Sequence, residues 1–327
     1  MLGDENSRSG RSVADMIDPA TAIGTVRLTV SDLERSVAFY ERSLGLLARA
    51  PEGSSVGLAT PDGAPLVELE GNPSAHPLER RATGLFHLAI LVPSRLELAR
   101  SLGRLAARGW PLDGASDHLV SEALYLSDPD GNGIEIYRDR PRAQWPRTNG
   151  QLRMATLPLD IDRLLSELSA NGASSTTAPG LSGPELVTGE AVAQAVPAAV
   201  PAGTRMGHIH LQMSDLGEAE EFYSGVLGFE VTVRGYPGAL FVSAGGYHHH
   251  IGLNTWHSAR AKPPPAGSIG LREYELVLPD ERALEGVVGR VQAAGLGTEA
   301  VARGARVRDP SGNAVVLRSD GRPPSLR

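Results

Sequence analysis

The segment His118–Glu135 places a histidine, a tyrosine and a glutamate around one tight turn, and such side chains can bind metals or move protons. The turn itself, Asp128–Asn132, reads Asp-Pro-Asp-Gly-Asn, a composition that favours chain reversal. If the segment folds as a hairpin centred on Asp130, Tyr125 lies across from Glu135. Because side chains alternate along a strand, both then share one face, and the neighbouring leucines and isoleucines share the other. An apolar core does not readily accept a phenol or a carboxylate. A strand face that carries both therefore indicates a functional site.

Histidines elsewhere in the chain could complete such a site. His87 begins an apolar run typical of a strand, and His208 shares a predicted strand face with His210 and Gln212. Three adjacent histidines stand in the run Gly245–Leu253. Each feature also has an ordinary explanation, because a single strand histidine is usually a hydrogen-bonded core residue and a histidine tract can be a solvated loop. The residue types alone leave both interpretations open.

Composition excludes several classes of function. The net charge of −7 and the pI near 5.7 argue against nucleic acid or an anionic membrane as partner, because both attract clustered lysine and arginine. No apolar run is long enough to span a bilayer, and residues 1–24 lack the apolar centre of a signal peptide, so we expect a cytoplasmic protein without membrane attachment. The chain has no cysteine, so any metal must be held by histidine and carboxylate.

One unit recurs four times along the 327 residues. A chain of this length is longer than a domain with one compact hydrophobic core usually is, so two domains or a repeated architecture is expected. Ser-Asp-Leu, followed by Phe-Tyr and Leu-Gly, occurs around Asp32 and again around Asp215, and an Asp-Pro-x-Gly-Asn turn begins at Asp128 and at Asp309. Such internal similarity predicts repeated strand–helix–strands units. The units cover residues 22–72, 84–140, 205–256 and 268–320.

These units predict an α+β protein with two domains. The expected parts are a flexible N-terminal tail (1–21), a first domain of two βαβββ modules (22–141), a linker (142–203), a second domain of two modules (204–320) and a short tail (321–327). The linker is rich in Ala, Ser, Thr, Gly and Pro, but Leu159–Leu168 is amphipathic. We expect this piece to dock as a helix, from where the linker could cover a neighbouring surface.

Four such units, with Phe-Tyr and Leu-Gly in the helix and Asp-Pro-x-Gly-Asn before the last strand, resemble the vicinal oxygen chelate superfamily of glyoxalases, antibiotic-resistance proteins and extradiol dioxygenases. The resemblance implies cup-shaped mixed sheets in two tandem halves, with metal ligands on the first and last strands of paired modules. The matching ligand positions are His87, Glu135 and His208, in modules two and three. Modules one and four offer no coherent set, so Glu68 and Glu273 are expected to be structural or solvated carboxylates. The cup must therefore form across the linker.

The segment His118–Glu135 also resembles the signature of extradiol ring-cleavage dioxygenases. Within that group, the bacterial catechol 2,3-dioxygenase-like proteins look most similar. His118, Tyr125 and Glu135 match the pattern around the Asp-Pro-x-Gly turn, whereas Ser116 departs from it. The resemblance implies a non-haem Fe(II) enzyme, with Mn(II) as the alternative metal, that opens a catechol-type or hydroquinone-type ring with O2. Two histidines and one carboxylate suit these metals and leave coordination positions free. The protein could also form a homo-oligomer.

The resemblance also implies roles for the side chains around the metal. His249 would take a hydroxyl proton from the diol and later return it, and Tyr125 and His118 would hydrogen-bond the diol oxygens. A shift of one residue in register would exchange His249 with His248 and His250. The walls of the pocket could include Trp110, Trp256, the loop Arg234–Ala239 and the linker.

Two other functions stay open at this point. One is a metal-dependent isomerase or transferase of the glyoxalase type, which usually carries a carboxylate or glutamine where this chain has His249. The other is a non-enzymatic protein that binds a small molecule such as a drug, and such members lack the metal ligands. The histidine at this position favours the dioxygenase over the isomerase or transferase, and bound iron would distinguish the dioxygenase from the non-enzymatic binder.

Overall fold

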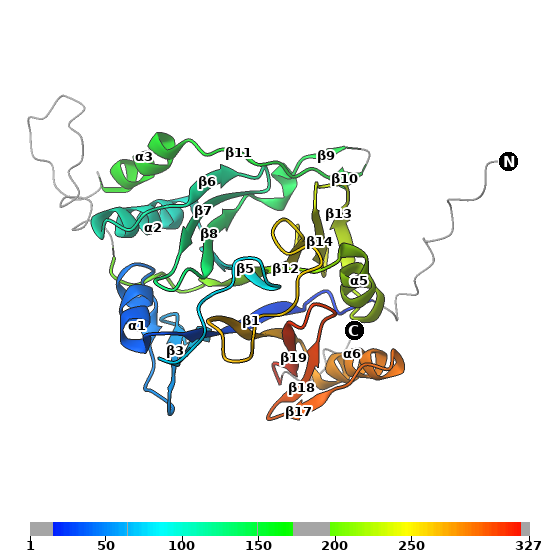
Figure 1. The fold of residues 1–327 in the computed structure, drawn as a ribbon. Coiled ribbons are helices and arrows are strands. Elements are labelled where there is room, and N and C mark those ends of the chain that lie inside the picture. Colours follow the sequence, from blue (N-terminus) through cyan, green and yellow to red (C-terminus); the bar gives the residue numbers. More distant parts are fainter. Residues whose placement is uncertain (1–15, 64, 149, 173–196, 322–327) are drawn as a thin grey trace, which may run out of the picture.

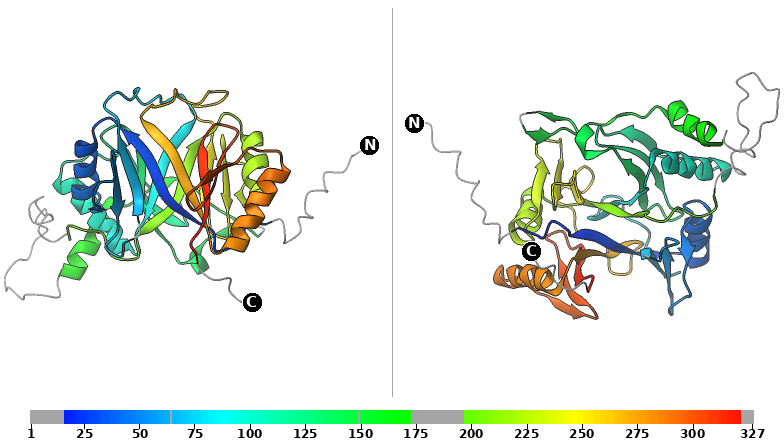
Figure 2. Two further views of the ribbon diagram at one scale, coloured as in Figure 1. Left: turned by 90° about the horizontal axis from the view of Figure 1, so that it is seen from below. Right: turned by 180° about the vertical axis from the view of Figure 1, so that it is seen from behind.

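The computed structural model describes residues 16–63, 65–148, 150–172 and 197–321. Two curled sheets fill the middle of the molecule, with α1 and α2 at one flank and α5 and α6 at the other (Figure 1 and Figure 2). The α+β class and the four modules are confirmed. Most of the expected N-terminal tail, the middle of the linker and most of the C-terminal tail lie outside the described residues.

The first two modules lie where the repeats predict them. The first consists of β1 (Ala22–Val30), α1 (Leu33–Arg42), β2 (Leu47–Ala48), β3 (Ser55–Ala59) and β4 (Pro65–Gly71). The second consists of β5 (Gly84–Leu91), α2 (Arg95–Ala107), β6 (Gly114–Asp117), β7 (Ser121–Ser127) and β8 (Gly133–Asp139). Residues just before the first module also pack on the fold, since Ile17 is buried and its N–H donates to the carbonyl of Gly228.

The last two modules repeat this order. The third consists of β12 (Arg205–Gln212), α5 (Leu216–Glu220), the wider turn η3 (Glu221–Val226), β13 (Glu230–Val233), β14 (Ala239–Ser243) and β15 (Ile251–Asn254). The fourth consists of β16 (Gly270–Leu278), α6 (Glu281–Ala293), β17 (Glu299–Val301), β18 (Gly304–Arg308) and β19 (Ala314–Ser319). No helix of the described residues is long and apolar enough to cross a membrane.

Each module starts its helix with the same kind of cap. A side-chain oxygen accepts a hydrogen bond from the backbone N–H three residues later, which satisfies a donor that the first helical turn leaves free. The capping residues are Asp32, Ser94, Asp215 and Asp280. The Leu-Gly pairs end the helices of modules one and three, where Gly45 and Gly228 adopt φ of 79° and 90°. The recurring Ser-Asp-Leu and Leu-Gly motifs therefore mark helix ends.

Both sheets join modules that are distant in the sequence. Strand β5 pairs with β12 to build a nine-stranded sheet in the order β11-β6-β7-β8-β5-β12-β15-β14-β13. Strand β1 pairs with β16 to build an eight-stranded sheet in the order β17-β18-β19-β16-β1-β4-β3-β2. The expectation that module two lies beside module three across the linker is confirmed. The division into domains 22–141 and 204–320 stays a prediction about the two sequence halves.

A buried hydrogen bond links the Phe-Tyr motif of one module to the Asp-Pro turn of the next. The Tyr40 hydroxyl donates to Asp128 Oδ2 at 3.2 Å, and the Tyr223 hydroxyl donates to Asp309 Oδ2 at 2.8 Å. Asp128 also accepts from the backbone N–H and the side-chain amide of Asn132, each at 2.9 Å. Because all of these groups are buried, the turn before β8 is held in one conformation.

The linker runs along the edge of the nine-stranded sheet. It contains the helical turn η2 (Arg142–Gln144), the short strands β9 (Arg147–Thr148), β10 (Gln151–Leu152) and β11 (Leu157–Pro158), and helix α3 (Ile161–Gly172). Strand β11 pairs with β6, and α3 packs against α2 with Leu164 fully buried. Arg95 on α2 reaches Glu167 on α3 at 2.8 Å. Helix α3 overlaps the segment Leu159–Leu168, for which the amphipathic pattern predicts a docking helix.

Candidate metal centre

Three neighbouring strands bring the predicted ligands together. His87 comes from β5, Glu135 from β8 and His208 from β12, and β5 lies between the other two strands. Glu135 Oε2 lies 3.0 Å from His87 Nε2 and 3.1 Å from His208 Nε2. All three side chains are buried, and one ligand atom of each lies within 4.8 Å of the other two. Of the described residues, no second group of three satisfies this criterion.

The spacing of these atoms fits one divalent cation. Two ligand atoms bound at right angles, each about 2.1 Å from a metal, lie about 3 Å apart, which is close to both separations from Glu135. His87 Nε2 is buried and makes no hydrogen bond of acceptable geometry, so a cation would satisfy an atom that is otherwise unpaired. Two imidazoles and one carboxylate form a donor set suited to Fe(II) or Mn(II). The residues present therefore fit the expected metal.

Glu135 and His208 are in their metal-binding protonation states near neutral pH. Burial by itself would raise the pKa of Glu135, but the imidazoles of His208 and His87 hold it well below its ordinary value. Burial lowers the pKa of His208 to about 4, although the Glu135 carboxylate acts in the opposite direction. An ionised carboxylate beside a neutral imidazole is what a cation requires, because protonated ligands cannot bind it.

A pocket of about 260 Å³ opens over this cluster. Its walls are largely aromatic, and Phe86, Tyr236, Phe241 and Trp256 all line it. A cavity of about 150 Å³ holds one benzene molecule, so this pocket has room on the scale of a substituted aromatic ring. The site thus has the polar metal-binding side chains at its floor and apolar side chains around it. This arrangement suits a flat ring.

The hairpin that carries Glu135 has the predicted register. Strands β7 and β8 pair antiparallel with Tyr125 opposite Glu135. The His118 Nδ1–H donates to the carbonyl of Ala155 at 2.8 Å, so Nε2 accepts the hydroxyl of Tyr125 at 2.6 Å. Burial and the Glu135 charge raise the pKa of Tyr125 well above its ordinary value. The structure therefore brings a protonated phenol and an oriented imidazole to the pocket.

Of the three adjacent histidines, His249 is the one that lines the pocket. Its ring centroid lies 4.2 Å from that of His208 and 5.0 Å from that of Phe241. His248 instead contacts Asp139, and His250 Nδ1 accepts the backbone N–H of Ala244. Burial lowers the pKa of His249 well below its ordinary value, so its imidazole is neutral. The predicted choice of His249 over its neighbours agrees with this geometry.

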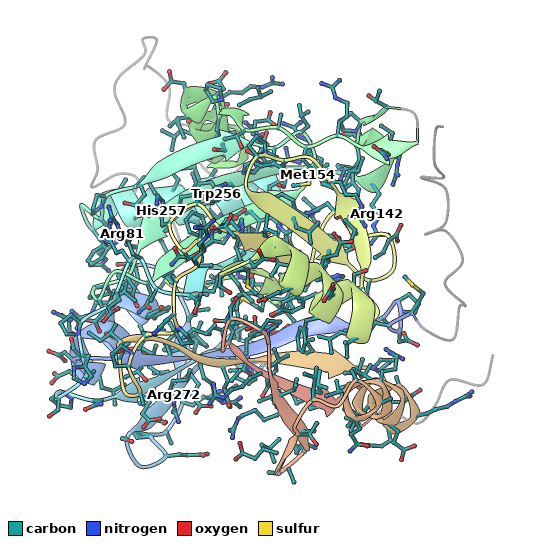
Figure 3. All side chains as sticks on the ribbon, turned by 45° about the vertical axis from the view of Figure 1, so that its right-hand side comes forward. Arg81, Arg142, Met154, Trp256, His257 and Arg272 are labelled. Atoms are coloured by element: carbon teal, nitrogen blue, oxygen red, sulfur yellow. The ribbon has the colours of Figure 1, made fainter. Side chains whose placement is uncertain are left out.

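The linker covers part of the pocket. Residues Met154–Thr156 line it, and the Thr156 hydroxyl lies 3.0 Å from the Tyr236 hydroxyl on the opposite wall. Figure 3 labels Met154 and Trp256, both of which line this pocket. Trp256 was expected there, as was the loop that contains Tyr236. Trp110 does not belong to the pocket, because its indole packs on Phe39 and donates to the carbonyl of Ser127.

Several residues of the pocket were not predicted. Phe86 and Phe241 could not be distinguished from ordinary core residues, because nothing in their local pattern differs from a buried strand. His210 was placed on the correct strand face by alternation, but no role was given to it. It lines the pocket, and its Nε2 is buried without a hydrogen-bond partner.

The equivalent positions of the other sheet hold ion pairs instead of ligands. Arg27 on β1 pairs with Glu273 on β16 in the same way that His210 on β12 pairs with His87 on β5. The Arg27 guanidinium contacts Glu68 and Glu273 at 3.0 Å each, and Glu275 at 2.8 Å. Glu68 and Glu273 are therefore structural carboxylates, as expected. An arginine at the centre of this cluster is incompatible with a cation site.

Comparisons with known proteins agree with this architecture. The family model described as Glyoxalase/Bleomycin resistance protein/Dioxygenase superfamily matches residues 22–136 and 205–317, which also confirms the two tandem halves. The chain is 45% identical over 300 residues to the protein named Catechol-2,3-dioxygenase of Bacillus subtilis (strain 168), covering 90% of this chain and 96% of that one. The crystal structure of glyoxalase I from Zea mays has the same fold, with a TM-score of 0.53, 15% identity and 92% of each chain covered. The chain therefore belongs to the Glyoxalase/Bleomycin resistance protein/Dioxygenase superfamily.

Proposed function

We propose that this protein is a non-haem Fe(II)-dependent extradiol dioxygenase that opens a catechol-type aromatic diol with O2. The observation that carries the proposal is the group of His87, Glu135 and His208 at the base of an aromatic pocket. Three protein ligands leave further coordination positions for two diol oxygens and O2. The relative of 45% identity, which is named a catechol-2,3-dioxygenase, supports the same reaction.

A bound Fe(II) would hold both reactants and pass electron density from the ring to O2. The protein's own contribution is to orient the diol and to handle its protons. The aromatic walls Phe86, Phe241 and Trp256 can pack against the ring, and Met154–Thr156 limits the access of water. Such an enclosure favours a flat substrate held in a single orientation.

His249 is the proposed base of the reaction. It faces the pocket as a neutral imidazole, which is the form that accepts a hydroxyl proton and can later return it. Tyr125 keeps its own proton directed at His118, so its oxygen can accept a hydrogen bond from a diol hydroxyl. His118 holds the phenol in this orientation through its second bond, to Ala155.

Oxygen uptake tests the proposal directly. The protein is loaded anaerobically with Fe(II) and mixed with a panel of substituted catechols and hydroquinones in an oxygen electrode. We expect one O2 to be consumed per diol, with the appearance of a yellow ring-opened product. No uptake with any diol of the panel would refute the proposed reaction.

Two matched variants separate the metal site from the fold. Glu135→Gln removes the only carboxylate ligand, and we expect iron content and turnover to fall by more than about 100-fold. Glu273→Gln changes a carboxylate of the other sheet, at the place that corresponds to His87, and should retain iron and turnover. Loading with Ni(II) or Zn(II) tests the isomerase alternative, since an enzyme of that kind would be active with these metals in the absence of O2.

A further inference from the structure

Asp139, His248 and His249 form one hydrogen-bonded chain that leads away from the pocket. Asp139 Oδ1 lies 2.9 Å from His248 Nε2, and His248 Nδ1 lies 2.8 Å from His249 Nδ1. Both imidazoles are buried, and the Asp139 carboxylate also accepts the Tyr247 hydroxyl at 2.9 and 3.1 Å. Asp139 is the last residue of β8, the strand that carries Glu135. The chain therefore connects the proposed base to the strand that also supplies a ligand.

The direction of each hydrogen bond follows from the chemistry of its two ends. An ionised carboxylate can only accept, so the hydrogen at this end must lie on His248 Nε2. In a tautomer whose single N–H lies on Nε2, His248 Nδ1 is left as an acceptor. His249 must then donate from Nδ1, because two bare nitrogens 2.8 Å apart would repel one another. The ring of His249 therefore has an unprotonated Nε2, and this nitrogen can accept a proton from a substrate in the pocket.

We propose that Asp139 and His248 are positioning residues for the reaction: together they hold His249 in the Nδ1–H tautomer, which leaves Nε2 free to accept a proton. The inference rests on the proposed function, in which His249 is the base. It adds that the Asp139 carboxylate, which reaches the substrate only through His248 and His249, determines which nitrogen of His249 is basic. Of the two positioning residues, His248 touches the base and Asp139 acts through it.

The same chain explains where a proton taken from the substrate can reside. When Nε2 of His249 accepts the hydroxyl proton, its Nδ1 proton can pass to Nδ1 of His248. Both nitrogens of His248 are then protonated, and the positive charge lies beside the Asp139 carboxylate. The His248 ring centroid is 6.3 Å from that of His208, compared with 4.2 Å for His249. The charge therefore moves away from the metal ligands, and the reverse transfer returns the proton to the substrate.

Histidine tautomers can be read by long-range ¹H–¹⁵N NMR, which does not depend on turnover. The full-length protein, labelled with ¹⁵N-histidine and loaded with diamagnetic Zn(II), should show His248 as the Nε2–H and His249 as the Nδ1–H tautomer. Asp139→Asn can direct its amide N–H at His248 Nε2, which would reverse both tautomers. In the Fe(II)-loaded protein we then expect kcat to fall by about 10²- to 10⁴-fold, with KM changed less than about threefold, by analogy with a triad whose orienting aspartate is replaced by asparagine.

Tyr247→Phe is the matched control. It removes a second hydrogen bond to Asp139 and the contact with the Tyr137 hydroxyl, but it leaves the chain from Asp139 to His249 intact. Both tautomers and kcat should stay close to those of the unmodified protein. A loss of kcat in this variant equal to that of Asp139→Asn would indicate a general packing effect and overturn the proposal.

The unmodified protein alone can also overturn the inference. An Nε2–H tautomer at His249 contradicts it even if Asp139→Asn does not fold. Reversed tautomers in Asp139→Asn with unchanged kcat contradict it as well. Failure of the proposed function is a separate result, because it appears as absent O2 uptake in the unmodified Fe(II) protein whatever tautomers the NMR spectrum shows.

Discussion

A methyl group added at Gly133 would collide with the strand that carries His87. A Cβ atom at this position would lie 2.1 Å from the carbonyl oxygen of Phe86 and 3.2 Å from His87 Cβ. Ordinary contacts to a Cβ begin near 3.4 Å. Because the obstructing atom belongs to the backbone, no change of rotamer relieves the overlap. Strands β5 and β8 must therefore move apart by roughly 1 Å in Gly133→Ala, as in other overpacked cores.

This movement should have two measurable effects. Overpacking of this kind costs about 1–3 kcal/mol of unfolding free energy, which urea unfolding of the metal-free protein will show. The same strands carry His87 and Glu135, and metal–ligand distances tolerate only about 0.2 Å of error. We therefore expect the dissociation constant for Fe(II) or Mn(II), measured by anaerobic titration, to rise at least about tenfold.

Gly114→Ala is the control for this prediction. Gly114 lies in β6 of the same sheet, and an added Cβ would meet no atom within 4 Å. Its unfolding free energy should change by less than about 0.5 kcal/mol, with unchanged metal affinity. If Gly133→Ala matched Gly114→Ala in both measurements, the packing of β8 against β5 would not position the ligands, and the reasoning would be wrong.

Three further predictions follow from buried groups. Burial lowers the pKa of His250 to about 3, so between pH 6.5 and 3 the unfolded chain binds a proton that the folded protein does not. The unfolding free energy should therefore decrease as the pH falls through this range, and His250→Asn, which keeps an acceptor for the Ala244 N–H, should flatten the decrease in urea titrations at pH 7, 5 and 4. Tyr40→Phe leaves Asp128 without one buried donor and should cost about 1–2 kcal/mol in thermal unfolding. Chelation should lower the melting temperature of the metal-loaded protein, because a metal at 100 times its Kd stabilises the fold by about 2.7 kcal/mol, and Glu135→Gln should show no such response.

The hairpin was predictable because its register depends on local rules. Alternation along a strand and the chemistry of the Asp128–Asn132 turn are enough to place Tyr125 opposite Glu135. Helix starts at Asp32 and Asp215 follow from equally local capping. The repeats then supplied the module order, since similar sequences build similar units.

The three-histidine segment shows where local rules stop. Residues between Ser243 and Ile251 form no strand, so alternation does not determine which of the three rings enters the pocket. The outcome depends on tertiary partners, because Asp139 binds His248 and Ala244 binds His250. The positioning role of Asp139 was not visible for the same reason, since it lies more than a hundred residues from the histidines that it contacts.

The sequence by itself determined the modules, the hairpin and the types of residue that could bind a metal, because these follow from short-range patterns and from composition. Local patterns alone do not pair β5 with β12; the family resemblance implied that modules two and three lie together, and the tertiary structure shows the strand pairing that brings His87 and His208 to the same carboxylate. It also decided that the linker covers the pocket and that the second sheet holds Arg27 where the first has an imidazole. Strand partners distant in sequence are selected by the burial of whole sheet faces, and no local pattern contains that information.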